Sequence, residues 1–140
     1  MKKNSAIGNM PFSSCKKDPD RYLLGEYIGT VYYSYDAIDP LYSRDSVYNN
    51  VSITLSESKE STRKEVRLNL KFNNHGNSLP SEDNLPVSNG EVDFSYGHMI
   101  SPGTFLRWKG NIQSNIMDLI FRVENGNGSL IKYVIKANKK

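Results

Sequence analysis

A strict alternation of apolar and polar residues recurs along this chain and constrains its fold more than any other feature. The clearest example is residues 65–72, which read EVRLNLKF and place an apolar residue at every second position. A period of two is the repeat of a half-buried β-strand, because successive side chains point to opposite faces of a sheet. Similar runs occupy residues 51–56, 91–96, 106–109, 117–123 and 131–137. The recurrence predicts an all-β chain.

Turn-forming residues separate these runs, and they set the number of strands. We interpret Asp39-Pro40 as the end of a first strand that runs from about Leu24 to Tyr35, and Asn49-Asn50 as the turn before the second strand. Residues 77–89 contain two prolines, so they form either a loop or a short edge strand. Seven or eight strands with short connections indicate an up-and-down barrel or a sandwich. We predict an antiparallel up-and-down barrel of about eight strands.

The length of 140 residues fits one domain, which we place at residues 21–140 behind a leader at residues 1–20. Residues 1–20 and Lys139-Lys140 each carry a net charge of +2, so residues 21–138 carry a net −1. A nucleic-acid-binding domain draws its affinity from phosphate contacts and needs a basic body. We therefore expect no nucleic-acid partner.

No catalytic or metal-binding motif is present in the sequence. The only histidines, His75 and His98, have no second histidine, cysteine or carboxylate at metal-ligand spacing. The chain also lacks Gly-x-Ser-x-Gly, a phosphate-binding loop and a dinucleotide fingerprint. We expect a protein that is not an enzyme and that uses no cofactor or metal.

Two sets of side chains have both a binding interpretation and a plainer one. Seven of the nine tyrosines lie between Tyr22 and Tyr48, where they either line a ligand site or serve as ordinary strand residues. Trp108 shares an apolar strand face with Leu106, which indicates a core position or a ligand contact. Four cations on the opposite strand faces form either a basic strip for an anionic partner or an ordinary charged exterior: Arg107, Lys109, Arg122 and Lys132.

Several short motifs resemble one bacterial family. Residues 25–30, which read GEYIGT, are similar to the opening strand of small calycin-like (lipocalin-like) domains of Bacteroidota lipoproteins. Residues 108–112, 117–121 and 133–139 resemble the closing hairpins of those domains. The resemblance covers about residues 23–139 and implies a calycin-like barrel that binds rather than catalyses.

The leader resembles the end of a lipoprotein signal. Residues 12–15, which read FSSC, look like a bacterial lipobox, and Lys2-Lys3 would form its basic start. The resemblance implies lipidation of Cys15 and a place in the bacterial cell envelope, either periplasmic or associated with the outer membrane. The domain would then meet a membrane only through its lipid anchor.

These features together predict a non-catalytic binding domain of a cell-envelope lipoprotein, monomeric and holding a small apolar ligand in its barrel. The residues expected to contact that ligand are Tyr27, Tyr33, Tyr35, Trp108 and Phe121. An alternative stays open, in which the core is filled and the outer surface and loops bind a protein or glycan partner.

Overall fold

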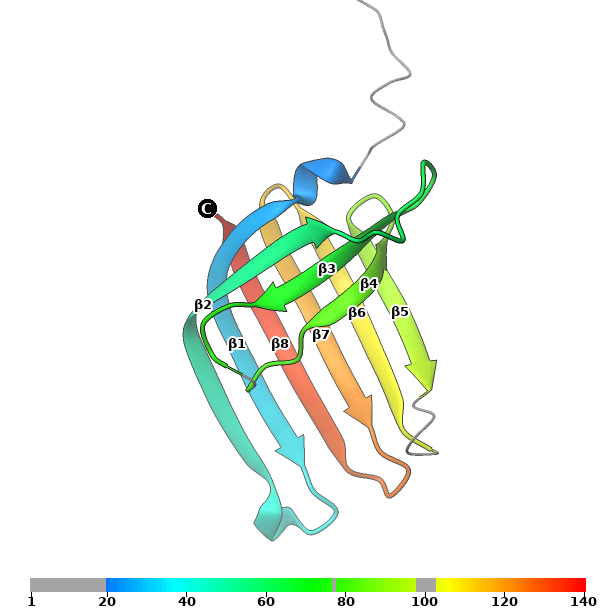
Figure 1. The fold of residues 1–140 in the computed structure, drawn as a ribbon. Helices are drawn as coiled ribbons and strands as arrows, with labels where there is room; N and C mark the ends of the chain where they lie inside the picture. The colour runs from blue at the N-terminus through cyan, green and yellow to red at the C-terminus, as the bar shows by residue number, and fades with distance from the viewer. Residues whose placement is uncertain (1–19, 77, 98–102) are drawn as a thin grey trace, which may run out of the picture.

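Eight antiparallel strands form one sheet that curls into a nearly closed barrel (Figure 1). The computed structural model describes residues 20–76, 78–97 and 103–140. The strands are β1 (Gly25–Asp36), β2 (Arg44–Glu57), β3 (Val66–Phe72), β4 (Glu82–Val87), β5 (Glu91–Gly97), β6 (Phe105–Gln113), β7 (Ile116–Glu124) and β8 (Leu130–Lys139). Two 3-10 turns, η1 (Arg21–Leu23) and η2 (Pro40–Tyr42), precede and follow β1. The predicted all-β, up-and-down architecture is confirmed.

The strands follow one another in space in the order β4-β3-β2-β1-β8-β7-β6-β5. The first and last strands, β1 and β8, pair along ten residues each, and this ladder closes most of the barrel. The two edges are β4 and β5, which a tight turn at Asn89-Gly90 connects. A Cβ on Gly90 would lie 2.4 Å from the Ile112 carbonyl oxygen, so this turn requires glycine. No ladder joins β4 to β5 within the described strands, so the barrel keeps one open seam.

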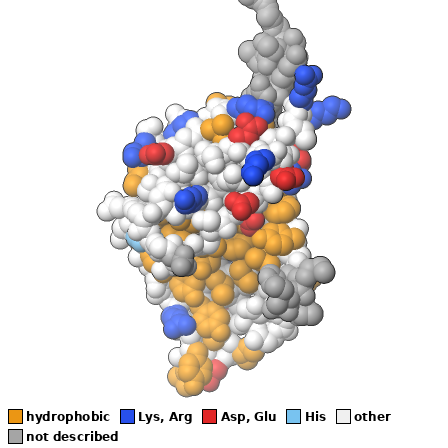
Figure 2. All heavy atoms as spheres, in the orientation of Figure 1, with side chains coloured by type: hydrophobic (Ala, Val, Ile, Leu, Met, Phe, Trp, Pro, Cys, Tyr) orange, Lys and Arg blue, Asp and Glu red, His pale blue; other side chains and the backbone are white. Residues whose placement is uncertain are grey.

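Unequal strand lengths divide the barrel into a covered half and an open half. β1 and β2 have 12 and 14 residues, whereas β3 and β4 have 7 and 6. β3 and β4 therefore cross only the upper half of the sheet in Figure 1, and hydrophobic side chains gather below that band in Figure 2. The covered half holds most of the fully buried core, which includes Tyr27, Ile53, Leu55, Leu68, Leu70, Leu85, Ile112, Met117, Leu119 and Ile135.

The Asn49-Asn50 pair lies inside β2 and is not a turn before it. Val51 pairs with Gly29 and Tyr48 pairs with Val31, so Asn49 and Asn50 together face the single residue between those two on β1. This two-against-one arrangement is a β-bulge, and Asn50 takes the left-handed conformation that it needs (φ 53°). The pattern that predicted a turn is that of a bulge because asparagine suits both.

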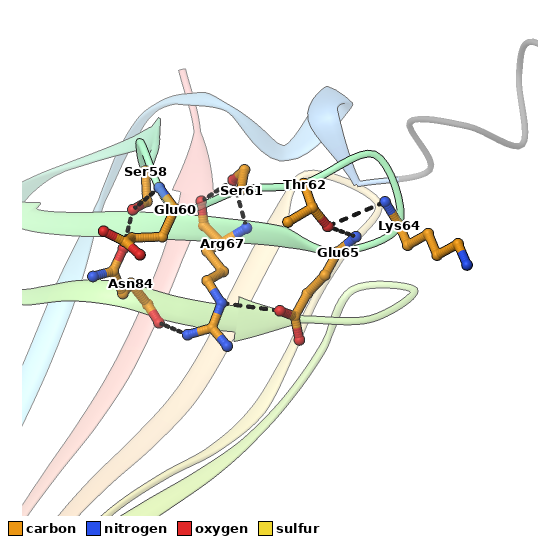
Figure 3. A network of polar contacts seen from close by, with 8 residues as sticks. All are labelled: Ser58, Glu60, Ser61, Thr62, Lys64, Glu65, Arg67 and Asn84. Atoms are coloured by element: carbon orange, nitrogen blue, oxygen red, sulfur yellow. Dashed lines mark hydrogen bonds and ion pairs between the residues drawn. The ribbon is translucent and has the colours of Figure 1, made fainter.

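The loop between β2 and β3 is held by a polar network (Figure 3). The Ser61 hydroxyl accepts the Arg67 N–H at 2.8 Å and donates to the Arg67 carbonyl at 3.0 Å. The Arg67 guanidinium reaches the Glu65 carboxylate at 2.9 Å and the Asn84 carbonyl on β4 at 3.4 Å. Ser58 donates to the Asn84 side chain. These contacts fix β3 and β4 to the end of β2.

The residue just before η1 is held against the turn between β4 and β5. Asp20, which the sequence placed in the leader, is buried, and its carboxylate accepts the backbone N–H groups of Asn89 at 3.1 Å and Gly90 at 2.7 Å. Of the two interpretations of residues 77–89, the edge strand is the one found. Pro86 has no backbone N–H to donate to a neighbouring strand, and it lies on this edge strand, where such a residue is tolerated.

Candidate ligand-binding face

A row of five aromatic residues crosses five neighbouring strands on the inner face of the sheet. In strand order from β1 to β5, Tyr33 pairs with Tyr133, Tyr133 with Phe121, Phe121 with Trp108 and Trp108 with Phe94. The ring centroids are 5.2 Å apart for Tyr33 and Tyr133, 6.1 Å for Tyr133 and Phe121, and 4.4 Å for Phe121 and Trp108. Contacting aromatic rings add stability beyond the area they bury. The row forms the boundary between the covered half and the open half.

A second inward row lies beyond the first, toward the open end. It consists of Arg44, Tyr35, Ile131, Val123, Leu106 and Tyr96, on six neighbouring strands. No described strand crosses in front of this row, because β3 and β4 end before it. Together with Tyr33, Tyr48, Phe94 and Tyr133, these residues form what we call the open inner face. All its apolar members are half-buried, so they present a partly solvated apolar surface.

The carboxylate of Glu82 bridges the seam between β4 and the β5–β6 ribbon. Its Oε1 accepts the Tyr96 hydroxyl at 2.8 Å and the Trp108 indole N–H at 2.9 Å. Burial, and then the hydrogen bond and negative charge of Glu82, raise the pKa of Tyr96 to about 12. This node fixes the orientation of Trp108, whose side chain is fully buried.

Tyrosine hydroxyls give the open inner face its polar groups. Those of Tyr33, Tyr35, Tyr48 and Tyr133 make no hydrogen bond with any residue that the structure describes. Burial raises the pKa of Tyr133, and the neighbouring Tyr33 and Tyr48 add to the effect. Each of these hydroxyls can donate or accept a hydrogen bond.

A shallow hollow of about 460 Å³ lies at the open end of the face. Its lining combines Tyr33, Tyr35 and Ile131 with Arg44, Asn125, Asn127 and Ser129. The Arg44 guanidinium lies over the Tyr35 ring, 5.8 Å from its centroid. A flat apolar surface with polar groups around its end suits a ligand with an apolar body and a polar head.

The residues predicted to bind a ligand are divided between the two halves. Tyr33 and Tyr35 lie on the open inner face, and Phe121 lies at its boundary, 4% exposed. Tyr27 and Trp108 are fully buried, and the Tyr27 hydroxyl donates to the Leu23 carbonyl at 2.8 Å. Burial, together with a smaller effect of Tyr22, raises the pKa of Tyr27. The predicted lipidation site, Cys15, lies outside the described residues.

Sequence reasoning missed Phe94, Tyr96 and Tyr133 as members of this face and Glu82 as its polar node, and it included Tyr48 only within the cluster of seven tyrosines. Alternation placed Phe94, Tyr96 and Tyr133 on apolar strand faces, but only the register across strands brings them to the same inner face as Tyr33. Tyr48 was hidden by the bulge that follows it, which shifts the alternation of β2 by one residue.

No protein-family model, curated protein or solved structure matches this chain. Among the described residues, no group of three histidine, cysteine or acidic side chains is placed to hold a metal ion. The described part of the chain also contains no helix long and apolar enough to cross a membrane.

His75 makes an edge-on contact with Tyr48, with ring centroids 5.4 Å apart.

Proposed function

We propose that this protein is a non-catalytic binding domain that holds a largely apolar ligand on its open inner face. The observation that supports it is the pair of inward rows at and beyond the ends of β3 and β4, with five aromatics in one row and three aliphatic side chains between two tyrosines in the next. Trp108 and Phe121 are buried at the boundary, and the other members of these rows are only half-buried or exposed. Side chains fill the covered half, so the open half offers the space for a ligand. A half-exposed apolar surface of this extent on a small domain is typical of a binding site.

In this proposal the domain belongs to a calycin-like lipoprotein of the bacterial cell envelope, tethered through acyl chains on Cys15. The support comes from the sequence, namely the GEYIGT opening of β1 and the FSSC motif of the leader. The protein binds as a monomer and uses neither a cofactor nor a metal.

Long-chain fatty acids are the first probe, because each has an apolar body and a polar head. We expect palmitate, added to the full chain, to change the fluorescence of Trp108, the only tryptophan, which lies in the aromatic row. Tyr133→Ala should weaken binding about tenfold, the equivalent of losing most of one buried aromatic contact. The matched control is Tyr32→Ala, because Tyr32 lies on the same ribbon and is 47% exposed on the outer face.

Native mass spectrometry of the protein from its natural host gives an independent measurement. A bound mass that leaves on denaturation, and that is lost in Tyr133→Ala but kept in Tyr32→Ala, supports the open inner face as the site. Equal loss in both variants, or palmitate binding that neither variant changes, contradicts it.

One observation favours a second function, the binding of a protein partner by the tip of the β1–β2 hairpin. Ile38, Leu41 and Tyr42 are 65%, 86% and 70% exposed there. Hydrogen bonds hold the tip in place, since the Asp39 carboxylate accepts the Leu41 N–H at 3.0 Å and the Ser43 hydroxyl accepts the Ala37 N–H at 3.0 Å. Apolar anchors on an ordered loop suit insertion into an apolar pocket of a partner.

The tip also has an acidic surround, with Asp36, Asp39 and Asp45 against a single arginine, Arg44. The complementary partner is a protein whose pocket has a basic rim. Chemical cross-linking in the native envelope should yield a product that Leu41→Ser abolishes and Tyr133→Ala preserves. A product that Leu41→Ser leaves unchanged would exclude the tip.

A further inference from the structure

Three cations stand directly opposite one another on the outer face of β6, β7 and β8. Arg107 pairs with Arg122, and Arg122 pairs with Lys132. Directly opposed residues have Cβ atoms about 4.5–5.5 Å apart, and like charges in that position destabilise a sheet. This cationic row is therefore an arrangement that folding alone disfavours.

Nearby carboxylates offset only part of this charge. Asp93 lies 3.3 Å from Arg107 and Glu124 lies 3.6 Å from Arg122, and all four side chains are about half exposed. Exposed pairs of this kind contribute little to stability. Lys132 makes no ion pair with any residue that the structure describes, and the same holds for Lys109 on β6.

The cationic row lines one side of a solvent-open hollow of about 440 Å³. Lys109 adds a fourth cation, and Ile120, which pairs with Lys109, contributes an apolar side chain. The one carboxylate in the lining, Asp118, already pairs with Lys136 at 3.3 Å. The hollow thus gathers four positive charges around an apolar residue, on the side of the sheet opposite to the open inner face.

We propose that this hollow binds an oxyanion, namely a phosphate group, between Arg107, Arg122 and Lys132. Guanidinium groups donate paired N–H groups that match the spacing of phosphate oxygens, and the lysine adds a third charge. A phosphate bound between them attracts all three cations and so offsets their mutual repulsion. The phosphate is either free or part of a lipid headgroup, and both sources present the same oxygens.

If the cationic row binds phosphate, removing one of its charges should weaken phosphate binding without lowering the stability of the fold. An ordinary charged exterior predicts no such difference. Lys132→Gln removes one repulsive contact and no ion pair, so the urea midpoint of unfolding should rise or stay unchanged. The same substitution should weaken phosphate binding about tenfold, the equivalent of one charge-assisted hydrogen bond. Lys71→Gln is the matched control, because Lys71 is exposed on β3, lies outside the hollow and makes no ion pair with any residue that the structure describes.

Backbone amide shifts in NMR spectra, recorded while inorganic phosphate replaces chloride at constant ionic strength, test the site. We expect shifts confined to β6, β7 and β8 around the cationic row in the wild type and in Lys71→Gln, and weaker binding in Lys132→Gln and Arg122→Gln. Shifts spread over the whole surface, or equal weakening in Lys71→Gln, would overturn the proposal. So would the absence of any phosphate effect.

Vesicles distinguish the two sources. Vesicles of phosphatidylglycerol that bind the wild type, and bind Lys132→Gln about tenfold more weakly, assign the site to a lipid headgroup. Binding of inorganic phosphate alone assigns it to a free phosphate. These measurements involve only the outer face, so their failure would leave the ligand proposal for the open inner face intact, and the reverse also holds.

Discussion

Removal of the Glu82 carboxylate is the most informative single perturbation of this protein. Glu82→Ala deletes the acceptor of two hydrogen bonds, those from Tyr96 at 2.8 Å and from Trp108 at 2.9 Å. The two donors differ in their surroundings. The Trp108 side chain is fully buried, whereas Tyr96 is half-buried and can turn its hydroxyl to water.

The expected loss in the free energy of unfolding follows from this difference in burial. An orphaned buried donor costs about 1–3 kcal/mol, and a lost hydrogen bond to a charged group adds about 1 kcal/mol when water can replace it. We expect Glu82→Ala to lower the free energy of unfolding by about 2–4 kcal/mol. Urea unfolding followed by tryptophan fluorescence measures it directly, because the only tryptophan donates one of the two bonds.

Two matched variants separate the contributions. Tyr96→Phe removes only the half-buried bond and should cost about 1 kcal/mol, while Glu82→Gln keeps an acceptor oxygen and should cost less than Glu82→Ala. A loss in Glu82→Ala no larger than that in Tyr96→Phe would show that the Trp108 bond contributes nothing. Equal losses in Glu82→Gln and Glu82→Ala would refute the role of the acceptor.

Three further predictions concern the same domain. The pKa of Tyr96 rises from 10.0 to about 12 on folding, so its contribution to stability is complete below pH 10 and disappears as the pH rises through 12. Alkaline urea unfolding should show this loss in the wild type and less of it in Tyr96→Phe. Asp20→Ala leaves two backbone donors of the β4–β5 turn without their acceptor and should cost about 2–3 kcal/mol by the same assay, whereas a cost near zero would contradict the contact. Gly90→Ala combines a φ of 77° with a Cβ too close to a carbonyl oxygen, so thermal unfolding should show a loss of about 2 kcal/mol or more.

The strands and their sequential order could be predicted because each has its own local signal. The alternation in residues 65–72 predicted β3 within one residue of its bounds, and the turn between β4 and β5 uses Asn89-Gly90, a pair typical of tight hairpin turns. The course of β2 could not be predicted, because its bulge uses the residues that a turn would use. A local pattern does not state whether the chain reverses or continues at such a pair.

The candidate site was predictable only in part, for a different reason. Alternation placed Trp108 and Phe121 on apolar strand faces, and cross-strand register then stacked them. How far the two inward rows are exposed depends on where β3 and β4 end relative to β1 and β8, which is a property of the whole sheet. The burial of Tyr27 and the exposure of Tyr33, six residues later on the same inner face, could not be read from composition or spacing.

The residues that follow β3 explain why the inner face stays open. Asn74 takes the place of a further β3 residue beside β2, since its side chain accepts the Ser52 N–H at 2.9 Å and donates to the Asn50 carbonyl at 2.7 Å. Those contacts end the β2–β3 ladder at the bulge, and the part of β2 before the bulge has only β1 beside it among the described strands. The inner face beyond that point has no opposing layer from β3 or β4. The aromatic side chains there pack against one another on one side only, and the proposed ligand would supply the layer that β3 and β4 do not.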